Sequence, residues 1–113
     1  MLHRLVILFA ILVGFTQVQA APLCVKNLDG SPFCLSQPAQ RIVSFAPHLT
    51  EMVFAVGAGA QLVGVVDHSD FPPAARALPN LGGYHQPDME KLLSLKPDLV
   101  LAWHSGASPA VLD

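Results

Sequence analysis

The chain has 113 residues, of which 52% are hydrophobic and only 12% are charged, with a formal net charge of −2 at pH 7. It has no basic stripe that could follow a phosphate backbone, so we expect no nucleic-acid partner. A chain of this length can bury one modest hydrophobic core.

The first 20 residues have the pattern of a secretory signal peptide. Arg4 supplies a basic start, Leu5 to Phe15 form an uncharged apolar stretch, and a small-residue cleavage pattern ends at Ala20. The apolar stretch is too short to span a bilayer comfortably. We therefore expect cleavage after Ala20, with an uncleaved membrane anchor as the alternative.

The exported protein is predicted to lie free in the periplasm. A lipoprotein signal needs a small residue directly before its cysteine, and here Leu23 precedes Cys24. We therefore expect no lipid anchor, which favours a Gram-negative periplasm over a Gram-positive surface.

Residues 21–40 are predicted to form a β-hairpin extension. Asp29 and Gly30 are a strong turn signal, and a three-residue loop closed by a left-handed Gly30 would bring Cys24 opposite Cys34. In an exported chain this arrangement predicts a cross-strand disulfide. The alternative, a redox-active or metal-binding pair, lacks the CxxC spacing.

The remaining residues, 41–113, alternate short apolar strands with helical segments, which predicts an α/β fold with a small parallel sheet. We predict strands at residues 41–45, 62–66 and 99–103. We predict a helix from Pro47 to about Gly57, a helical turn at 74–78, a helix from Asp88 to Lys96, and a further helix starting near Pro109.

Two apolar patterns predict which side chains are buried. The first helix carries a stripe at helical spacing, formed by Leu49, Met52, Val53 and Val56. The third strand is an unbroken apolar run, which is typical of a strand covered on both faces.

Ring-bearing residues follow the predicted strands, where a parallel sheet gathers its ligands. His48 follows the first strand, His68 follows the second and Trp103 ends the third, while Tyr84 lies in a loop after a glycine pair. Flat aromatic faces with a polar edge suit a large planar ligand, so we expect Tyr84 and Trp103 to border one. The alternative for Trp103 is partial burial against a helix.

Other chemistry is less well supported by the sequence. The four histidines outside the signal, His48, His68, His85 and His104, match no short metal signature, although one of them could be an axial ligand of haem. Glu90 is either a helix-dipole charge or a docking charge for a basic partner. No nucleophile and base are arranged for catalysis, so we expect no enzyme.

Three phrases taken in order, RIVSFAPHLTEMVFAVGAG, LVGVVDHSDFPPAA and GGYHQPDMEKLLSLKPDLVLAW, resemble the cobalamin (vitamin B12) and iron-chelate substrate-binding proteins of ABC importers. The resemblance covers Arg41 to about Gly106. It implies that residues 41–113 are the truncated N-terminal lobe of a two-lobed periplasmic binding protein of the helical-backbone type, class III. Some relatives also carry the hairpin.

The resemblance also implies a function and a site. The expected function is to capture cobalamin in the periplasm and deliver it to an inner-membrane permease, as a monomer and without a resident cofactor. Tyr84, Trp103, His68 and His48 would face the ligand, and Glu90 would pair with permease arginines. The alternatives are a haem or ferric-siderophore carrier, a secreted metal-dependent enzyme, and a fragment without function.

Overall fold

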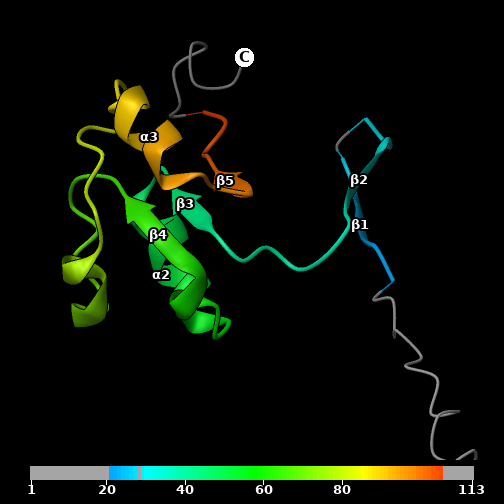
Figure 1. Ribbon diagram of the computed structural model, residues 1–113, viewed down its shortest axis with the longest axis horizontal. Coiled ribbons are helices and arrows are strands. Elements are labelled where there is room, and N and C mark those ends of the chain that lie inside the picture. The colour runs from blue at the N-terminus through cyan, green and yellow to red at the C-terminus, as the bar shows by residue number, and fades with distance from the viewer. Residues whose placement is uncertain (1–20, 28, 106–113) are drawn as a thin grey trace, which may run out of the picture. The chain divides into compact units, whose positions relative to one another are not determined.

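The computed structural model describes residues 21–27 and 29–105. They belong to two compact units that divide between Gln37 and Pro38 (Figure 1). The predicted signal peptide and the helix expected near Pro109 lie outside the described residues. In the ranges that are described, no helix has the length and apolar character needed to cross a bilayer.

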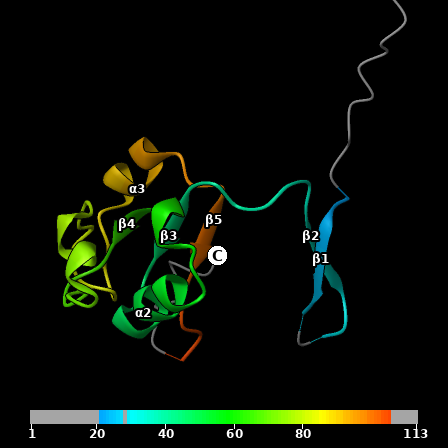
Figure 2. The ribbon, with the colours of Figure 1, turned by 90° about the horizontal axis from the view of Figure 1, so that it is seen from below.

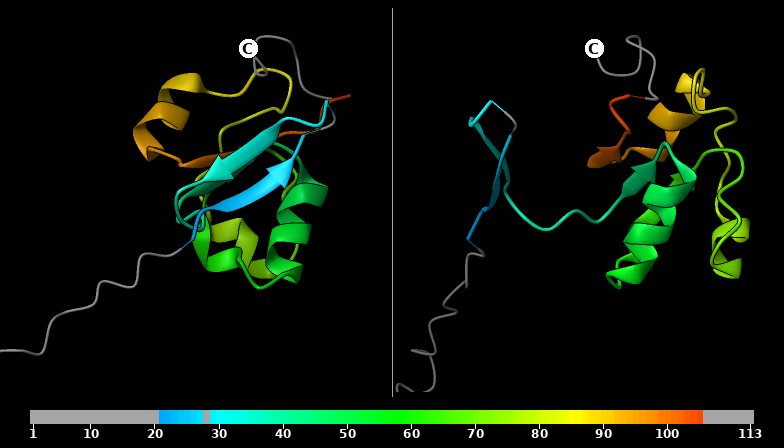
Figure 3. Two further views of the ribbon diagram at one scale, coloured as in Figure 1. Left: turned by 90° about the vertical axis from the view of Figure 1, so that its right-hand side faces the viewer. Right: turned by 180° about the vertical axis from the view of Figure 1, so that it is seen from behind.

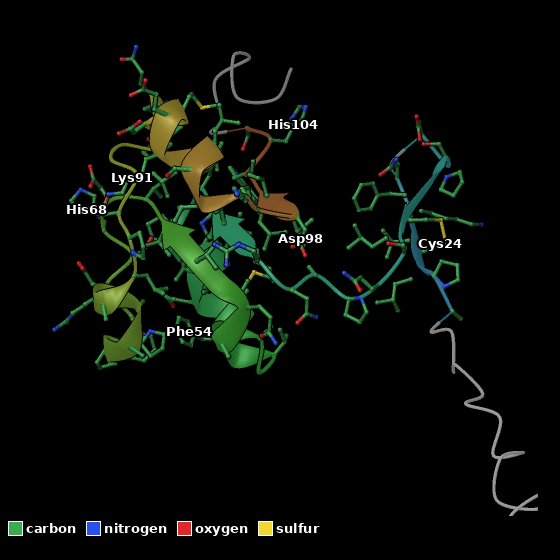
Figure 4. The ribbon with its side chains drawn as sticks, in the orientation of Figure 1. Cys24, Phe54, His68, Lys91, Asp98 and His104 are labelled. Atoms are coloured by element: carbon green, nitrogen blue, oxygen red, sulfur yellow. A yellow bond between two sulfur atoms is a disulfide. The ribbon has the colours of Figure 1, made fainter. Side chains whose placement is uncertain are left out.

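The first unit contains an antiparallel hairpin of β1 (Leu23–Lys26) and β2 (Pro32–Leu35). The Asn27 N–H donates to the Ser31 carbonyl oxygen at 2.8 Å, and Gly30 has a φ of 84°, as the predicted turn requires. Cys24 pairs with Cys34 in the ladder, and the predicted disulfide joins them (Figure 4).

The second unit, called the lobe below, is built on a parallel sheet of β3 (Ile42–Ser44), β4 (Leu62–Val65) and β5 (Leu99–Leu101). The strand order is β4-β3-β5, so β3 is central. The predicted α/β class is therefore confirmed.

Two α-helices cover opposite faces of this sheet, as Figure 2 and Figure 3 show. The helix α2 (Pro47–Ala55) begins with a proline, whose fixed φ suits the first turn, and ends before Gly57, which has a φ of 81°. The helix α3 (Met89–Leu95) begins where the Asp88 carboxylate accepts the Lys91 N–H at 2.9 Å. The described part of the lobe also contains two 3-10 turns, η2 (Gly59–Gln61) and η3 (Pro73–Ala77).

The core consists of two clusters, one on each side of the sheet, because neighbouring residues of β3 point to opposite faces. Val43 belongs to the α3 side and Ile42 to the α2 side. The α3 cluster contains Val43, Phe45, Val66, Leu81 and Leu92. The α2 cluster contains Ile42, Val53 and Leu62, with Phe54, Leu99 and Leu101 packed against it.

The apolar stripe predicted for the first helix describes its buried face only in part, because Val53 is buried and Leu49 half-buried while the other two members are exposed. Met52 and Val56 are 61% and 80% exposed, whereas Thr50 and Val53 are buried. The helix is rotated so that Phe54 packs against the α2 cluster. A polar residue can occupy the buried face here because the Thr50 hydroxyl is satisfied by hydrogen bonds.

The prediction that the third strand is covered on both faces is also wrong. Its centre, Val100, is 39% exposed, while Leu99 and Leu101 pack on the α2 side. The reason is positional, since β5 is an edge strand and α3 packs on β4, at the opposite edge of the sheet. One face of β5 is therefore left uncovered within the described lobe.

Candidate functional site

The candidate site is the exit edge of the sheet, which we define as the carboxyl ends of β3, β4 and β5 with the residues that follow each strand. The three strands end level, because Ser44 pairs with both Val65 and Leu101. The Phe45 N–H donates to the Leu101 carbonyl oxygen at 2.8 Å and extends this pairing beyond the strands. Residues that follow the strands are thereby brought to one edge, as the parallel topology predicts.

His48 and Trp103 form the one ring contact between two strand exits that the described residues contain. Their ring centroids are 5.0 Å apart and their planes meet at 87°, an edge-to-face arrangement. Trp103 is 52% exposed, so about half of it is open to solvent, and its contact with His48 of α2 agrees with the alternative of partial burial against a helix. The first turn of α2 and the residues after β5 thus present one continuous aromatic surface.

His68 lies in the β4 exit loop, residues 66–72. Its φ is 65°, in the left-handed region that side chains with a Cβ rarely adopt, and its side chain is exposed. Figure 4 shows it projecting outward from the lobe. The residue before it is tied down, since the Asp67 N–H donates to the Gly82 carbonyl oxygen at 2.9 Å.

Tyr84 lies in the loop that precedes α3, and hydrogen bonds hold this loop at both of its ends. The Gly82 N–H donates to the side-chain oxygen of Asn80 at 2.6 Å, and the Asp88 N–H donates to the Leu81 carbonyl oxygen at 2.8 Å. The Tyr84 ring is 42% exposed. It lies over the ring of His85 with a centroid distance of 3.9 Å.

The four predicted residues are therefore all solvent-accessible, and two of them touch. No ring contact among the described residues joins His68 or Tyr84 to the pair formed by His48 and Trp103. The backbone bond between Asp67 and Gly82 nevertheless ties the loop of His68 to the loop of Tyr84. The exit edge thus carries one ring pair, His48 with Trp103, and two further predicted rings, His68 and Tyr84, on loops that are bonded to each other.

Two further residues that the sequence singled out are Glu90 and His104. Glu90 is exposed in the first turn of α3, beside Lys91, whose ammonium donates to the Asn80 carbonyl oxygen at 2.6 Å. His104 is exposed one residue beyond Trp103. Over residues 21–27 and 29–105, no three His, Cys, Asp or Glu side chains gather in a way that could hold a metal ion.

A shallow hollow of about 250 Å³ lies away from these rings, between α2 and the β4 exit loop. It is lined by Glu51, Phe54, Ala55, Phe71 and Pro72. None of the four predicted residues borders it, so we base the candidate site on the ring geometry of the exit edge.

The sequence did not point to three hydroxyl groups behind the exit edge. Ser44, Thr50 and Ser69 are buried and bonded to one another. The sequence carries a signal for Ser44, which lies inside an apolar run, but not for Ser69, which lies between His68 and Asp70. Only their burial, however, distinguishes them from ordinary surface hydroxyls.

Comparison with known proteins defines the class of this chain. A model of the periplasmic binding protein family matches residues 42–111. The vitamin B12-binding protein of Vibrio cholerae is 47% identical over 86 residues, which are 76% of this chain and 30% of that protein. The protein of the same name from Pectobacterium carotovorum is 48% identical over 81 residues, or 70% of this chain and 29% of that protein.

Solved structures give the same assignment. The crystal structure of the periplasmic vitamin B12-binding protein BtuF of Vibrio cholerae matches with a TM-score of 0.63 and 47% identity, over 66% of this chain and 29% of that one. A periplasmic haem-binding protein from Pseudomonas aeruginosa matches with a TM-score of 0.61 and 38% identity, over 66% and 26% of the two chains.

The fold is that of part of a class III periplasmic binding protein. The chain belongs to the periplasmic binding protein family. It spans about 30% of the length of the curated relatives that it matches.

Proposed function

We propose that this chain contributes to the substrate-binding component of an ABC importer, which captures cobalamin in the periplasm and delivers it to an inner-membrane permease. The observation that carries the proposal is the exposed edge-to-face pair of His48 and Trp103 at the exit edge. Relatives named as vitamin B12-binding proteins, at 47% and 48% identity, support the choice of ligand.

The proposed mode of binding is contact between a flat macrocycle and the rings of the exit edge. Trp103 and Tyr84 are 52% and 42% exposed, so each offers aromatic area to a ligand without unfolding any part of the core. Covering exposed aromatic area is favourable by about 25 cal/mol per Å². The exposed His48 and His68 would add polar contacts at the rim.

Haem, or a ferric siderophore, is the second candidate ligand. Two exposed histidines, His48 and His68, each present an imidazole at the exit edge, and a single imidazole suffices as an axial ligand of haem iron. The haem-binding protein of Pseudomonas aeruginosa, at 38% identity, supports this alternative.

The ligand can be tested by nuclear magnetic resonance, which detects weak binding. Cyanocobalamin at millimolar concentration should shift the Trp103 indole and the amides near His68 and Tyr84, whereas the amides of the hairpin serve as the reference. Hemin is tested separately through its Soret band, with His48→Ala and His68→Ala as variants. A Soret shift that one of these variants abolishes, without any shift caused by cobalamin, would reject cobalamin in favour of haem.

We further propose that Glu90 is the docking charge for the permease. Its carboxylate is exposed at the start of α3 and accepts no hydrogen bond from the other described residues, which leaves it free for an arginine. Charges at an interface rim act mainly on association and orientation.

The docking role can be tested in a chimera of this lobe with the remainder of the Vibrio cholerae relative. Glu90→Gln should leave cobalamin affinity unchanged and reduce uptake, whereas Glu51→Gln, which neutralises an exposed carboxylate on α2, should change neither. Equal uptake by the Glu90 variant and the parent would reject the docking role.

We also propose export to the periplasm, with the signal peptide removed after Ala20, no lipid anchor, and a monomeric state. The disulfide between Cys24 and Cys34 supports an oxidising compartment. Mass spectrometry of the protein recovered from the periplasm would test the cleavage site and the absence of a lipid.

A further inference from the structure

Behind the exit edge, three buried hydroxyl groups connect three different parts of the lobe. Ser44 ends β3, Thr50 lies in α2, and Ser69 belongs to the β4 exit loop. Their exposed fractions are 0%, 0% and 5%. The Thr50 oxygen lies 3.0 Å from the Ser44 oxygen and 3.3 Å from the Ser69 oxygen.

Each of these hydroxyls carries one proton to donate. Ser44 donates to the Ala46 carbonyl oxygen at 3.0 Å. The Thr50 oxygen lies within hydrogen-bonding distance of the Ser44 oxygen, the Ser69 oxygen and, at 3.3 Å, the Ala46 carbonyl oxygen, and every proton is used once when Thr50 donates to Ser44 and Ser69 donates to Thr50. The result is a directed chain that runs from the β4 exit loop through α2 to the end of β3.

This chain of hydroxyl groups constrains His68, which directly precedes Ser69 in the sequence. The backbone of His68 is left-handed, with a φ of 65°, so the surrounding structure must hold it there. Two neighbours supply that constraint, since the Asp67 N–H is bonded to the Gly82 carbonyl oxygen and Ser69 is bonded to Thr50. Of these three consecutive residues, only His68 has an exposed side chain.

We propose that Thr50 is a positioning residue for the candidate binding site, because its buried hydroxyl anchors Ser69 and thereby holds the exposed imidazole of His68 at the exit edge. A buried hydroxyl chain is favourable only when each member is satisfied, so it specifies one arrangement of the loop. An apolar residue at position 50 would fill the same space and leave the loop free to shift. The inference rests on the proposed function only in taking the exit edge as the surface that faces a ligand.

Amide hydrogen exchange of the 113-residue chain, measured without any ligand, tests this role. Thr50→Val keeps the shape of the side chain and removes its hydroxyl, while Thr50→Ser keeps the hydroxyl. In the valine variant the Ser69 amide should exchange about tenfold faster, with the Val43 amide in β3 changed by less than about twofold. The serine variant should restore the slow exchange at Ser69.

A second variant makes the test independent of whether the first one folds. Ser69→Ala removes the other end of the bond and should release the same loop, and the double variant should release it no further than the larger single change. Ser94→Ala, which removes an exposed helix hydroxyl that bonds to the Lys91 carbonyl oxygen, is the matched control and should leave Ser69 unchanged.

Two results would overturn the proposal. Equal acceleration at Ser69 and Val43 would mean that Thr50 is only a part of the core, and unchanged exchange at Ser69 would mean that the hydroxyl does not hold the loop. Because no ligand is present, a negative result here is distinct from a failure of the chain to bind cobalamin or haem.

Discussion

The imidazole of His48 meets the indole of Trp103 edge to face, with 5.0 Å between the ring centroids. His48 lies in the first turn of α2 and Trp103 follows β5, so the contact depends on the pairing of β3 with β5. Through this contact, the residues that follow β3 and those that follow β5 form one surface.

This contact should be measurable as a coupling energy. A double-mutant cycle with His48→Ala and Trp103→Leu, followed by urea unfolding, should give a coupling of about 0.5–1 kcal/mol, as expected for a partly exposed aromatic pair. His104→Ala is the control, because no ring contact joins His104 to Trp103 among the described residues. Additive effects of the first two substitutions would mean that the rings do not interact in solution.

The hairpin should depend on its disulfide. A two-stranded hairpin is marginal in water, and closing a loop of this size contributes about 2–3 kcal/mol. Replacing Cys24 and Cys34 together by serine should therefore abolish exchange protection in β1 and β2. The amides from Pro38 onward are the reference, because they belong to the other compact unit. Protection that persists in the double variant would contradict this expectation.

Asp98 should make stability depend on pH. Its carboxylate accepts the N–H groups of Gln40 at 2.8 Å and Arg41 at 2.9 Å, and these bonds, that from Gln40 first, hold the pKa of Asp98 below its ordinary value. A lowered pKa in the folded state stabilises the fold above the ordinary carboxyl pKa, and this stabilisation is lost as the pH falls through the folded value.

Asp98→Asn should accordingly lower the denaturation midpoint at neutral pH, and its difference from the parent should shrink as the pH falls below the ordinary carboxyl range. Asp70→Asn is the control, because that carboxylate accepts no hydrogen bond from the described residues. A difference for Asp98→Asn that stays constant down to strongly acidic pH would contradict the assignment.

Gly64 in β4 should not tolerate a larger residue without cost. A Cβ built there lies 2.8 Å from the δ-carbons of Leu81 and Leu95, both of which must move. Gly64→Ala should therefore reduce the free energy of unfolding by about 1–3 kcal/mol. Gly83→Ala, whose Cβ would meet nothing within 4 Å, should change it by less than about 0.5 kcal/mol. Equal effects at the two positions would show that the core accommodates the added methyl group.

Local patterns in the sequence were sufficient to predict the order of the helices and strands. The turn at Gly30 led to the correct hairpin pairing, Asp88 caps its helix as predicted, and the alternation of strands and helices led to a parallel sheet. The exposure of His48 and Trp103 at the exit edge also agrees with the expectation drawn from their positions after strands.

By itself, then, the sequence determined the elements of this protein, because turns, caps and strand runs depend on the backbone geometry of a few neighbouring residues. Only the tertiary structure decided which side chains are buried, as Met52, Thr50 and Val100 show, because burial depends on which element lies over each face. The same holds for the contact of His48 with Trp103 and for the hydroxyl chain through Thr50, each of which joins segments that are distant in sequence.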